Sequence, residues 1–328
     1  MNTDDENGLG DVFRKTLGHY TVHTRGREID CVLSSLLHKQ LIYPGTDPTS
    51  LRRAVQAVQT IKHVDPLAIG DHVRYLEAGN GSGMIIEVMP RRSKLSRLAP
   101  VPGQRVFEQV IVSNIDQVVP VFAAVSPPPK WGLLDRYLVS AEASRLPSLI
   151  VITKLDLAGK NSKLDADLEA YRRICYPIRL VSSITGQGID GLKQSLAGRM
   201  SVLVGKSGVG KTSLLNALQP GLGLRVNAVS QGNLGKGLHT TAHLEMFELD
   251  FGGALVDTPG TREFGLWDIA SEDLAYLFPE MAEYVGQCKF GLSCRHDQEP
   301  ECAVRKAVMS GAVSPYRYKS YLRLREEL

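Results

Sequence analysis

The pattern with the clearest chemical meaning is a glycine-rich loop between an apolar strand pattern at residues 201–204 and a helical pattern from residue 212. The loop consists of Gly205, Lys206, Ser207, Gly208, Val209, Gly210, Lys211 and Thr212, and Ser213 follows it. This order fits the phosphate-loop pattern Gly-x-x-x-x-Gly-Lys-Ser/Thr, in which backbone N–H groups at a helix start face phosphate. Lys211 would reach the β- and γ-phosphates and Thr212 would bind Mg²⁺. An accidental glycine turn is the alternative, and the strand–loop–helix context argues against it.

A second phosphate motif lies further along the chain. Residues 254–256 form an apolar strand pattern, and Asp257-Thr-Pro-Gly260 follows directly. An aspartate at the end of a strand parallel to the phosphate-loop strand can hold the water shell of Mg²⁺. The backbone N–H of Gly260 can contact the γ-phosphate. Such a turn is common by itself, so its meaning depends on the phosphate loop beside it.

Two loops before the phosphate loop have the residues that guanine recognition requires. Thr153, Lys154 and Asp156 follow an apolar strand pattern at residues 149–152, and Ser182 and Ser183 follow another at residues 178–181. The Asp156 carboxylate can accept both guanine N1–H and the exocyclic amine, a donor pair that adenine lacks. Lys154 would lie along the base. Thr153 stands where asparagine is usual, so we expect the loss of one bracing amide. The serine loop is the weaker signal of the two.

The segment between the phosphate loop and Asp257 contains candidate switch residues. Thr240 is our choice for completing Mg²⁺ coordination, and Thr241 is the alternative. Many such enzymes orient water with a glutamine after the Asp-x-x-Gly motif, but Thr261 stands there and is too short. We therefore expect slow intrinsic hydrolysis. His239 is the candidate for orienting water, the alternative being that it only packs or faces solvent.

The order of these motifs is circularly permuted, because the base-reading loops precede the phosphate loop in the chain. Domain termini often lie close together, so a permuted chain can build the same site. The permutation leads the second switch, after Asp257, directly into the C-terminal region. We therefore expect movement of that switch to be tied to whatever the C-terminal region binds.

The C-terminal region contains a compact set of metal-ligand residues. Cys288, Cys294, His296 and Cys302 are separated by five, one and five residues. Three thiolates and one imidazole can close a tetrahedral shell around one structural zinc ion. Cysteines that cluster by chance are the alternative.

Composition and hydrophobic patterns divide the chain of 328 residues into four parts. Residues 1–17 predict a disordered tail, and residues 18–110 a small β-barrel with a helical insertion at 49–62. Residues 111–277 alternate apolar strands and helices, which predicts a parallel sheet with helices on both faces. Residues 278–328 predict a helical zinc-binding domain.

The chain has a formal net charge of +3 and no apolar run long enough for a membrane span. With no recognisable export signal we expect a cytoplasmic protein, in which clustered cysteines favour metal over disulfides. We expect a monomer. Two basic clusters could contact RNA phosphates, or could be solvated faces with aromatic residues packed inward. They are Arg91, Arg92, Lys94 and Arg97, and, with three interleaved tyrosines (Tyr316, Tyr318 and Tyr321), Arg317, Lys319, Arg323 and Arg325.

The motif set resembles the ribosome small subunit-dependent GTPase A (RsgA) family, also called YjeQ or YloQ. The resemblance rests on the permuted order, the Gly-x-His-Thr-Thr and Asp-Thr-Pro-Gly-x-Arg-Glu-Phe segments, the cysteine cluster, and residues 90–97, 114–117, 134–138 and 299–304. It implies an OB-fold domain, a permuted GTPase domain and a zinc domain. It further implies GTP hydrolysis stimulated by the small ribosomal subunit and its rRNA in late maturation, with hydrolysis driving release. The departures are the long insertion, the first cysteine interval and Thr261.

Overall fold

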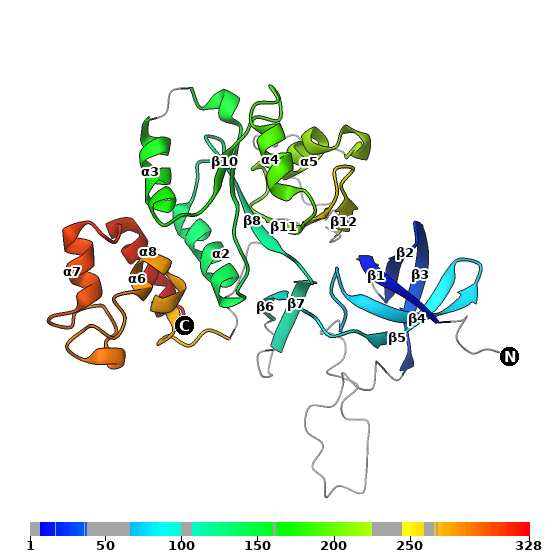
Figure 1. Ribbon diagram of the computed structural model, residues 1–328, viewed down its shortest axis with the longest axis horizontal. Coiled ribbons are helices and arrows are strands. Elements are labelled where there is room, and N and C mark those ends of the chain that lie inside the picture. The colour runs from blue at the N-terminus through cyan, green and yellow to red at the C-terminus, as the bar shows by residue number, and fades with distance from the viewer. Residues whose placement is uncertain are drawn as a thin grey trace, which may run out of the picture.

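In the computed structural model, residues 7–16, 18–35, 37, 66–99, 107–159, 162–224, 245–258, 266 and 268–328 are described. The chain forms an N-terminal barrel, a central sheet covered by helices and a C-terminal helical domain, which lie in a row (Figure 1). The fold class predicted from the sequence is confirmed. The insertion predicted at residues 49–62 lies outside the described residues.

Five strands close the N-terminal barrel in the order β1-β2-β3-β5-β4 and back to β1. Their bounds are β1 (Asn7–Thr16), β2 (His19–Thr24), β3 (Arg27–Leu33), β4 (His72–Gly79) and β5 (Ser82–Val88). β3 and β5 are parallel, and the other neighbours are antiparallel. Inward residues such as Val12, Val22, Ile29 and Ile85 form its core, as the alternating strand patterns predict.

The predicted disordered tail at residues 1–17 is wrong for residues 7–16, which form β1 and pair with both β2 and β4. Gly8 and Gly10 lower the strand propensity of this segment, which hid it. The barrel requires both glycines. A Cβ at Gly8 would lie 2.2 Å from the Tyr75 ring, and one at Gly10 would lie 2.6 Å from a Val22 methyl group.

A hairpin of β6 (Lys94–Ala99) and β7 (Phe107–Ser113) connects the barrel to the central sheet. The predicted domain boundary at residue 110 therefore falls inside β7. The buried Asp71 carboxylate fixes this junction, accepting hydrogen bonds from Arg91 Nε and Ser113 Oγ, both at 2.6 Å. Nearby, Asn114 Nδ2 donates to the Gly70 carbonyl at 2.8 Å. The barrel is thus held firmly against the central domain.

The central sheet has the order β10-β9-β8-β11-β13-β12, with only β12 antiparallel to its neighbour β13. Its strands are β8 (Gln117–Ala123), β9 (Ile150–Thr153), β10 (Ile178–Leu180), β11 (Met200–Val204), β12 (Glu245–Glu248) and β13 (Ala254–Asp257). One face packs on α2 (Trp131–Ala143) and α3 (Ser162–Arg173), the other on α4 (Ile189–Leu196) and α5 (Lys211–Leu218). β8 and β9 are buried at every residue, which explains their continuous apolar runs. The outer edge of β12 also contacts β1, so one continuous sheet joins the two domains.

Short helices and 3₁₀ turns build the C-terminal domain around its own apolar cluster. They are η5 (Leu274–Leu277), α6 (Pro279–Ala282), η6 (Gly291–Ser293), α7 (Ala303–Ser310) and α8 (Pro315–Glu326). Arg317 of α8, 1% exposed, donates to Asp135 of α2 at 2.7 Å and to Glu280 of α6 at 2.7 Å and 3.0 Å. Tyr171 of α3 also donates to Asp135, at 2.9 Å. This buried ion cluster fastens the domain to the helices of the central sheet.

Candidate nucleotide site and metal cluster

The predicted phosphate loop lies between β11 and α5, at the carboxyl end of a central parallel strand. Two of its glycines are required by geometry. A Cβ at Gly205 would lie 2.4 Å from the Val121 carbonyl oxygen, and Gly210 has a φ of +98° just before the helix. The other predicted loop residues share this turn, and Thr212 and Ser213 lie in the first turn of α5. The loop thus leads into the start of a helix, whose free backbone N–H groups could bind an anion.

Lys211 and Asp257 bring opposite charges to the floor of this loop. Lys211 is 7% exposed, and its Nζ donates to the Gly205 carbonyl at 2.7 Å. Burial lowers its pKa, and the Asp257 carboxylate opposes this change. Burial raises the pKa of Asp257 to about 6, and the Lys211 ammonium opposes that rise. Both groups are held out of water beside the loop, where a phosphate and its cation would replace the missing solvation.

The surroundings of Asp257 fit a hydrated Mg²⁺ ion. Its Oδ1 is buried and has no hydrogen-bond partner within the described part of the chain. A buried carboxylate oxygen of this kind is costly unless something binds it. The next residue, Thr258, is fully buried, and its hydroxyl donates to the Leu203 carbonyl at 2.7 Å. Thr258 thereby ties the Asp257 segment to the phosphate-loop strand, a role that our sequence reading missed.

The base-reading loop is tied directly to the phosphate loop. The Lys154 ammonium donates to the Gly208 carbonyl at 2.7 Å and also to the Ser126 carbonyl. Thr153 is buried, and its hydroxyl lies within donating distance of the Val209 carbonyl and of the Phe122 carbonyl, the latter at 3.2 Å. We expected a lost brace at Thr153, whereas the hydroxyl contacts the phosphate loop itself.

The guanine-reading carboxylate is oriented by the second predicted loop. The Ser182 hydroxyl donates to Asp156 Oδ1 at 2.5 Å, and Ser182 Oγ accepts from the backbone N–H groups of Ile184 and Thr185. Ser182 is fully buried, so Asp156 is held by a fixed partner. Ser183 lies in the same turn. The structure therefore brings the residues from both predicted loops together.

Thr261 lies outside the described residues, and so do four candidates for the switch and γ-phosphate contacts. These candidates are His239, Thr240, Thr241 and Gly260. Their predicted roles stay predictions.

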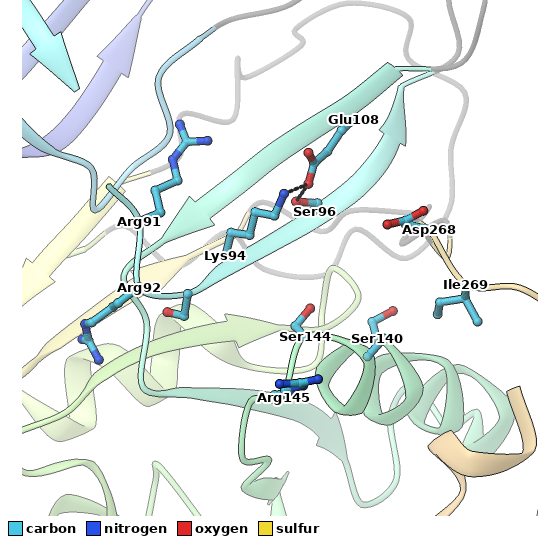
Figure 2. Close-up of a pocket in the computed structure, with 12 residues that line it drawn as sticks. Arg91, Arg92, Lys94, Ser96, Glu108, Ser140, Ser144, Arg145, Asp268 and Ile269 are labelled. Carbon is cyan, nitrogen blue, oxygen red and sulfur yellow. Dashed lines mark hydrogen bonds and ion pairs between the residues drawn. The ribbon is translucent and has the colours of Figure 1, made fainter. Parts of the chain in front are cut away.

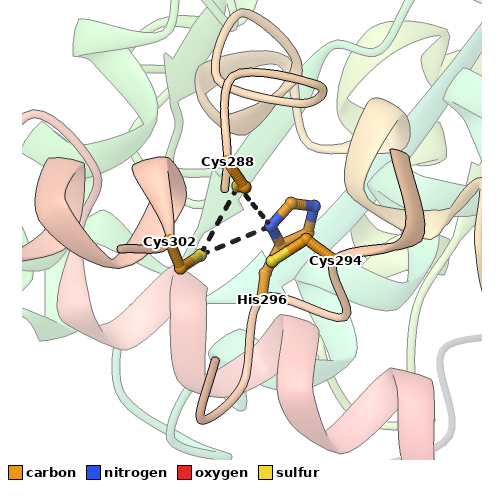
Figure 3. A group of neighbouring side chains, drawn as sticks. All are labelled: Cys288, Cys294, His296 and Cys302. Atoms are coloured by element: carbon orange, nitrogen blue, oxygen red, sulfur yellow. Dashed lines mark hydrogen bonds between the residues drawn. The ribbon is translucent and has the colours of Figure 1, made fainter. Parts of the chain in front are cut away.

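The predicted metal ligands converge in the C-terminal domain, where Cys288, Cys294, His296 and Cys302 are all buried (Figure 3). Their ligand atoms all lie within 4.8 Å of one another. Cys288 Sγ is 3.4 Å from His296 Nδ1 and 3.8 Å from Cys302 Sγ. A tetrahedral shell with metal–sulfur bonds of about 2.3 Å requires sulfur atoms about 3.8 Å apart. The cluster therefore has the spacing of a four-ligand metal site.

The two predicted basic clusters are largely engaged within the protein. Arg91 binds Asp71, and Arg92 binds Asp116 at 2.6 Å. Figure 2 shows the contact of Lys94 with Glu108, at 2.6 Å. In the C-terminal cluster, Arg317 and Tyr321 are buried, so for these two the inward alternative is correct. Within that cluster Tyr316, Lys319 and Arg323 are exposed.

Comparison with known proteins identifies the family. The RsgA GTPase family model matches residues 88–267. The chain is 46% identical to a small ribosomal subunit biogenesis GTPase RsgA of Gemmatimonas aurantiaca over 80% of this chain and 84% of that protein. It is 43% identical to the corresponding protein of Chlorobaculum tepidum over 80% and 85%. The chain belongs to the RsgA GTPase family.

Solved structures extend the likeness of this RsgA-family chain to its whole length. The crystal structure of YjeQ from Thermotoga maritima matches with a TM-score of 0.72 and 31% identity, covering 98% of both chains. YloQ, a circularly permuted GTPase, matches with a TM-score of 0.67 and 29% identity, covering 100% of this chain and 96% of that one. The chain is therefore a GTP-hydrolysing enzyme with a permuted motif order. Within its described residues, no helix is both long and apolar enough to cross a membrane.

Proposed function

We propose that this GTPase binds the small ribosomal subunit and acts in its late maturation. The subunit stimulates hydrolysis, and hydrolysis drives release. The names of the relatives support the target. The observation that carries GTP chemistry is the contact of Lys154 with Gly208, because it joins a base-reading loop to a phosphate loop in one site.

In this proposal the phosphate end of the site works through charge. The backbone from Gly205 to Ser213 surrounds the β-phosphate, and Lys211 draws the β- and γ-phosphate oxygens together. Asp257 and Thr212 would hold Mg²⁺, and the orphaned Asp257 Oδ1 supports this. When bound, Mg²⁺ neutralises charge that develops on the phosphates. Gly260 contacts the γ-phosphate through its backbone N–H.

The base end selects guanine, because Asp156 accepts two donors that adenine does not present. Lys154 lies along the base, Thr153 braces the loop, and the backbone after Ser182 and Ser183 reads the guanine oxygen. Thr240, with Thr241 as the alternative, completes the cation shell when the γ-phosphate is present. His239 orients the attacking water in place of the missing glutamine.

The cysteine cluster holds one structural zinc ion in this proposal. Three sulfur ligands and one imidazole favour zinc over the harder Mg²⁺ and Ca²⁺, which prefer oxygen ligands. All four positions come from the protein, so no open position for catalysis is expected. The enzyme acts as a cytoplasmic monomer, and exposed basic residues such as Lys319 and Arg323 are available to rRNA phosphates.

GTP turnover measured with and without small subunits tests the proposal. We expect slow hydrolysis alone and a large increase with small subunits. Turnover that is undetectable in both conditions would reject the enzymatic function, leaving a nucleotide-shaped binding module. Co-sedimentation in a non-hydrolysable GTP analogue tests the partner, and binding to the large subunit alone would contradict it. His239→Ala, run in parallel, should lose stimulated turnover while retaining GDP affinity.

Asp156→Ala tests the assignment of the base end. We expect the variant to lose its preference for GTP over ATP, because the carboxylate that pairs with guanine is gone. Competition of GDP and ADP for the site measures this preference. Ser183→Ala serves as a matched control in the neighbouring loop, since only the Ser183 backbone has an assigned role. An unchanged preference in Asp156→Ala would contradict the assignment.

A further inference from the structure

Strand β12 lies between the barrel and the strand that carries Asp257, and one row of residues crosses all three strands. Arg14 of β1 is the ladder partner of Glu245 in β12, and Glu245 is the ladder partner of Asp257 in β13. The row continues in β11, where Leu203 pairs with Asp257. A residue of the barrel therefore stands two strands away from the proposed Mg²⁺ ligand.

The middle residue of this row lies on the same face of the sheet as Asp257. Directly opposite residues of an antiparallel pair direct their side chains to the same face, and Glu245 and Asp257 are such a pair. A carboxylate gains no stabilisation from a carboxylate directly opposite. A cation that holds Glu245 therefore has to come from the other side of β12, which faces the barrel.

Arg14 provides that cation from the barrel. Its Nε donates to Glu245 Oε1 at 2.9 Å, and its Nη2 contacts the same oxygen. The two side chains retain 45% and 30% of their exposure. A pair this exposed contributes little to folding stability. Its main effect is therefore on the position of the Glu245 side chain. A second cross-domain contact, between His23 Nδ1 and Glu248 Oε1 at 3.1 Å, lies at the other end of β12.

We propose that Arg14 is a positioning residue for GTP hydrolysis, which acts through Glu245 to keep β12 and its carboxylate in place beside Asp257. This inference rests on the proposed function, because it assumes that Asp257 serves the hydrolysis of GTP. It gives the barrel a direct route to the γ-phosphate end of the site, since the barrel and Asp257 share one row of a continuous sheet.

The barrel does not depend on Arg14 for its attachment. The separate junction at Asp71, with Arg91, Ser113 and Asn114, holds the two domains together. Loss of the Arg14 contact should therefore leave the domains docked. The chain also offers a matched control. Arg74 and Glu87 form the same kind of antiparallel ladder pair, at 2.9 Å, wholly inside the barrel.

The test compares Arg14→Gln, Arg14→Glu and the conservative Arg14→Lys with the wild type and the control Arg74→Glu. The kcat and KM for GTP are measured alone and with saturating small subunits, together with GDP affinity and thermal stability. The coupling of an exposed pair is small, so Arg14→Gln should lower kcat by no more than about five-fold. Arg14→Glu places like charges opposite each other and should lower kcat further than Arg14→Gln does. Arg14→Lys keeps a cation beside Glu245 and should stay within about two-fold of the wild type.

The KM for GTP, GDP affinity and thermal stability should stay unchanged, because the phosphate and base loops are untouched. A loss in Arg14→Lys as large as that in Arg14→Glu, or an equal loss in Arg74→Glu, would overturn the inference. A change confined to subunit affinity would also overturn it, since that result assigns Arg14 to direct RNA contact. The wild type distinguishes failure of the proposed function from failure of this inference. Absence of turnover by the wild type contradicts the proposed function, whereas normal turnover by Arg14→Glu contradicts only this inference.

Discussion

Asp257→Asn should stabilise the nucleotide-free enzyme while abolishing Mg²⁺-dependent hydrolysis. Burial raises the pKa of the Asp257 carboxyl from its ordinary 3.8 to about 6. Each pKa unit corresponds to about 1.4 kcal/mol, so the charged carboxylate costs the folded chain about 3 kcal/mol. Asparagine has the same shape and no charge, and the variant should gain up to that amount.

The pH dependence follows from the direction of this shift. The folded chain holds the Asp257 proton more tightly than the unfolded chain, so the cost is absent below the ordinary pKa. It grows as the pH rises from about 4 to about 6 and is complete above pH 6. The stability difference between Asp257→Asn and the wild type should therefore be largest at pH 8 and should shrink toward zero near pH 4.

Urea unfolding followed by tryptophan fluorescence measures the difference. Trp131 packs in the same core as Val256, next to Asp257. Replacing Trp267, the other of two tryptophans, by Phe makes Trp131 the only reporter. Nucleotide and Mg²⁺ are omitted, without a chelator that would disturb the cysteine cluster. Asp250→Asn, at an exposed site after β12, should change stability by less than about 0.5 kcal/mol. Equal stabilities at pH 8, or a difference that does not vary with pH, would refute the reasoning.

Variants at three further residues probe other contacts. Thr153→Val removes the hydroxyl beside Val209 and should cost about 1 kcal/mol, or about five-fold in GDP affinity, whereas Thr153→Ser should not; equal affinities would contradict the brace. Cys294→Ser should release the metal and loosen the C-terminal domain, and undiminished zinc by metal analysis would count against the site. Arg317→Ala leaves Asp135 and Glu280 buried without their cation, and it should lower the free energy of unfolding by about 3–5 kcal/mol in urea. Arg317→Lys should recover only part of this stability, because an ammonium lacks the planar fork of the guanidinium.

The parts of the fold that the sequence predicted are those in which local pattern and chemistry agree. The apolar runs that end at Thr153, Val204 and Asp257 are buried strands of one parallel sheet. Each is followed by its motif, because the carboxyl ends of parallel strands share one edge where ligands bind. The spacing of Cys288, Cys294, His296 and Cys302 was equally informative. Ligands this close in sequence can be expected to converge even when the fold is not known.

The sequence predictions that failed concern residues whose structure depends on contacts with residues far away in the sequence. The sequence of strand β1 resembles a polar tail. Its glycines are explained only by distant residues, because Tyr75 packs beside Gly8 and Val22 packs beside Gly10. Arg317 resembles an RNA-binding residue in a basic helix, and only Asp135, 182 positions away in sequence, makes it a buried anchor. The brace at Thr153 likewise needs the Val209 carbonyl, which no local pattern predicts.

The permuted order acquires a more definite mechanical meaning from these contacts. We expected the segment after Asp257 to pass the nucleotide state to the C-terminal domain. That domain, however, is held against α2 and α3 by Arg317. Moving the domain away would leave buried charges without their partners, at a free-energy cost of several kcal/mol. Leu266, the first described residue after Asp257 and Thr258, packs in the core of the same domain. The C-terminal domain is thus better suited to be a fixed support for this segment than a moving arm. The exposed Arg14–Glu245 contact is far weaker than the Arg317 cluster, so the barrel side is where binding of a partner would most readily alter the site.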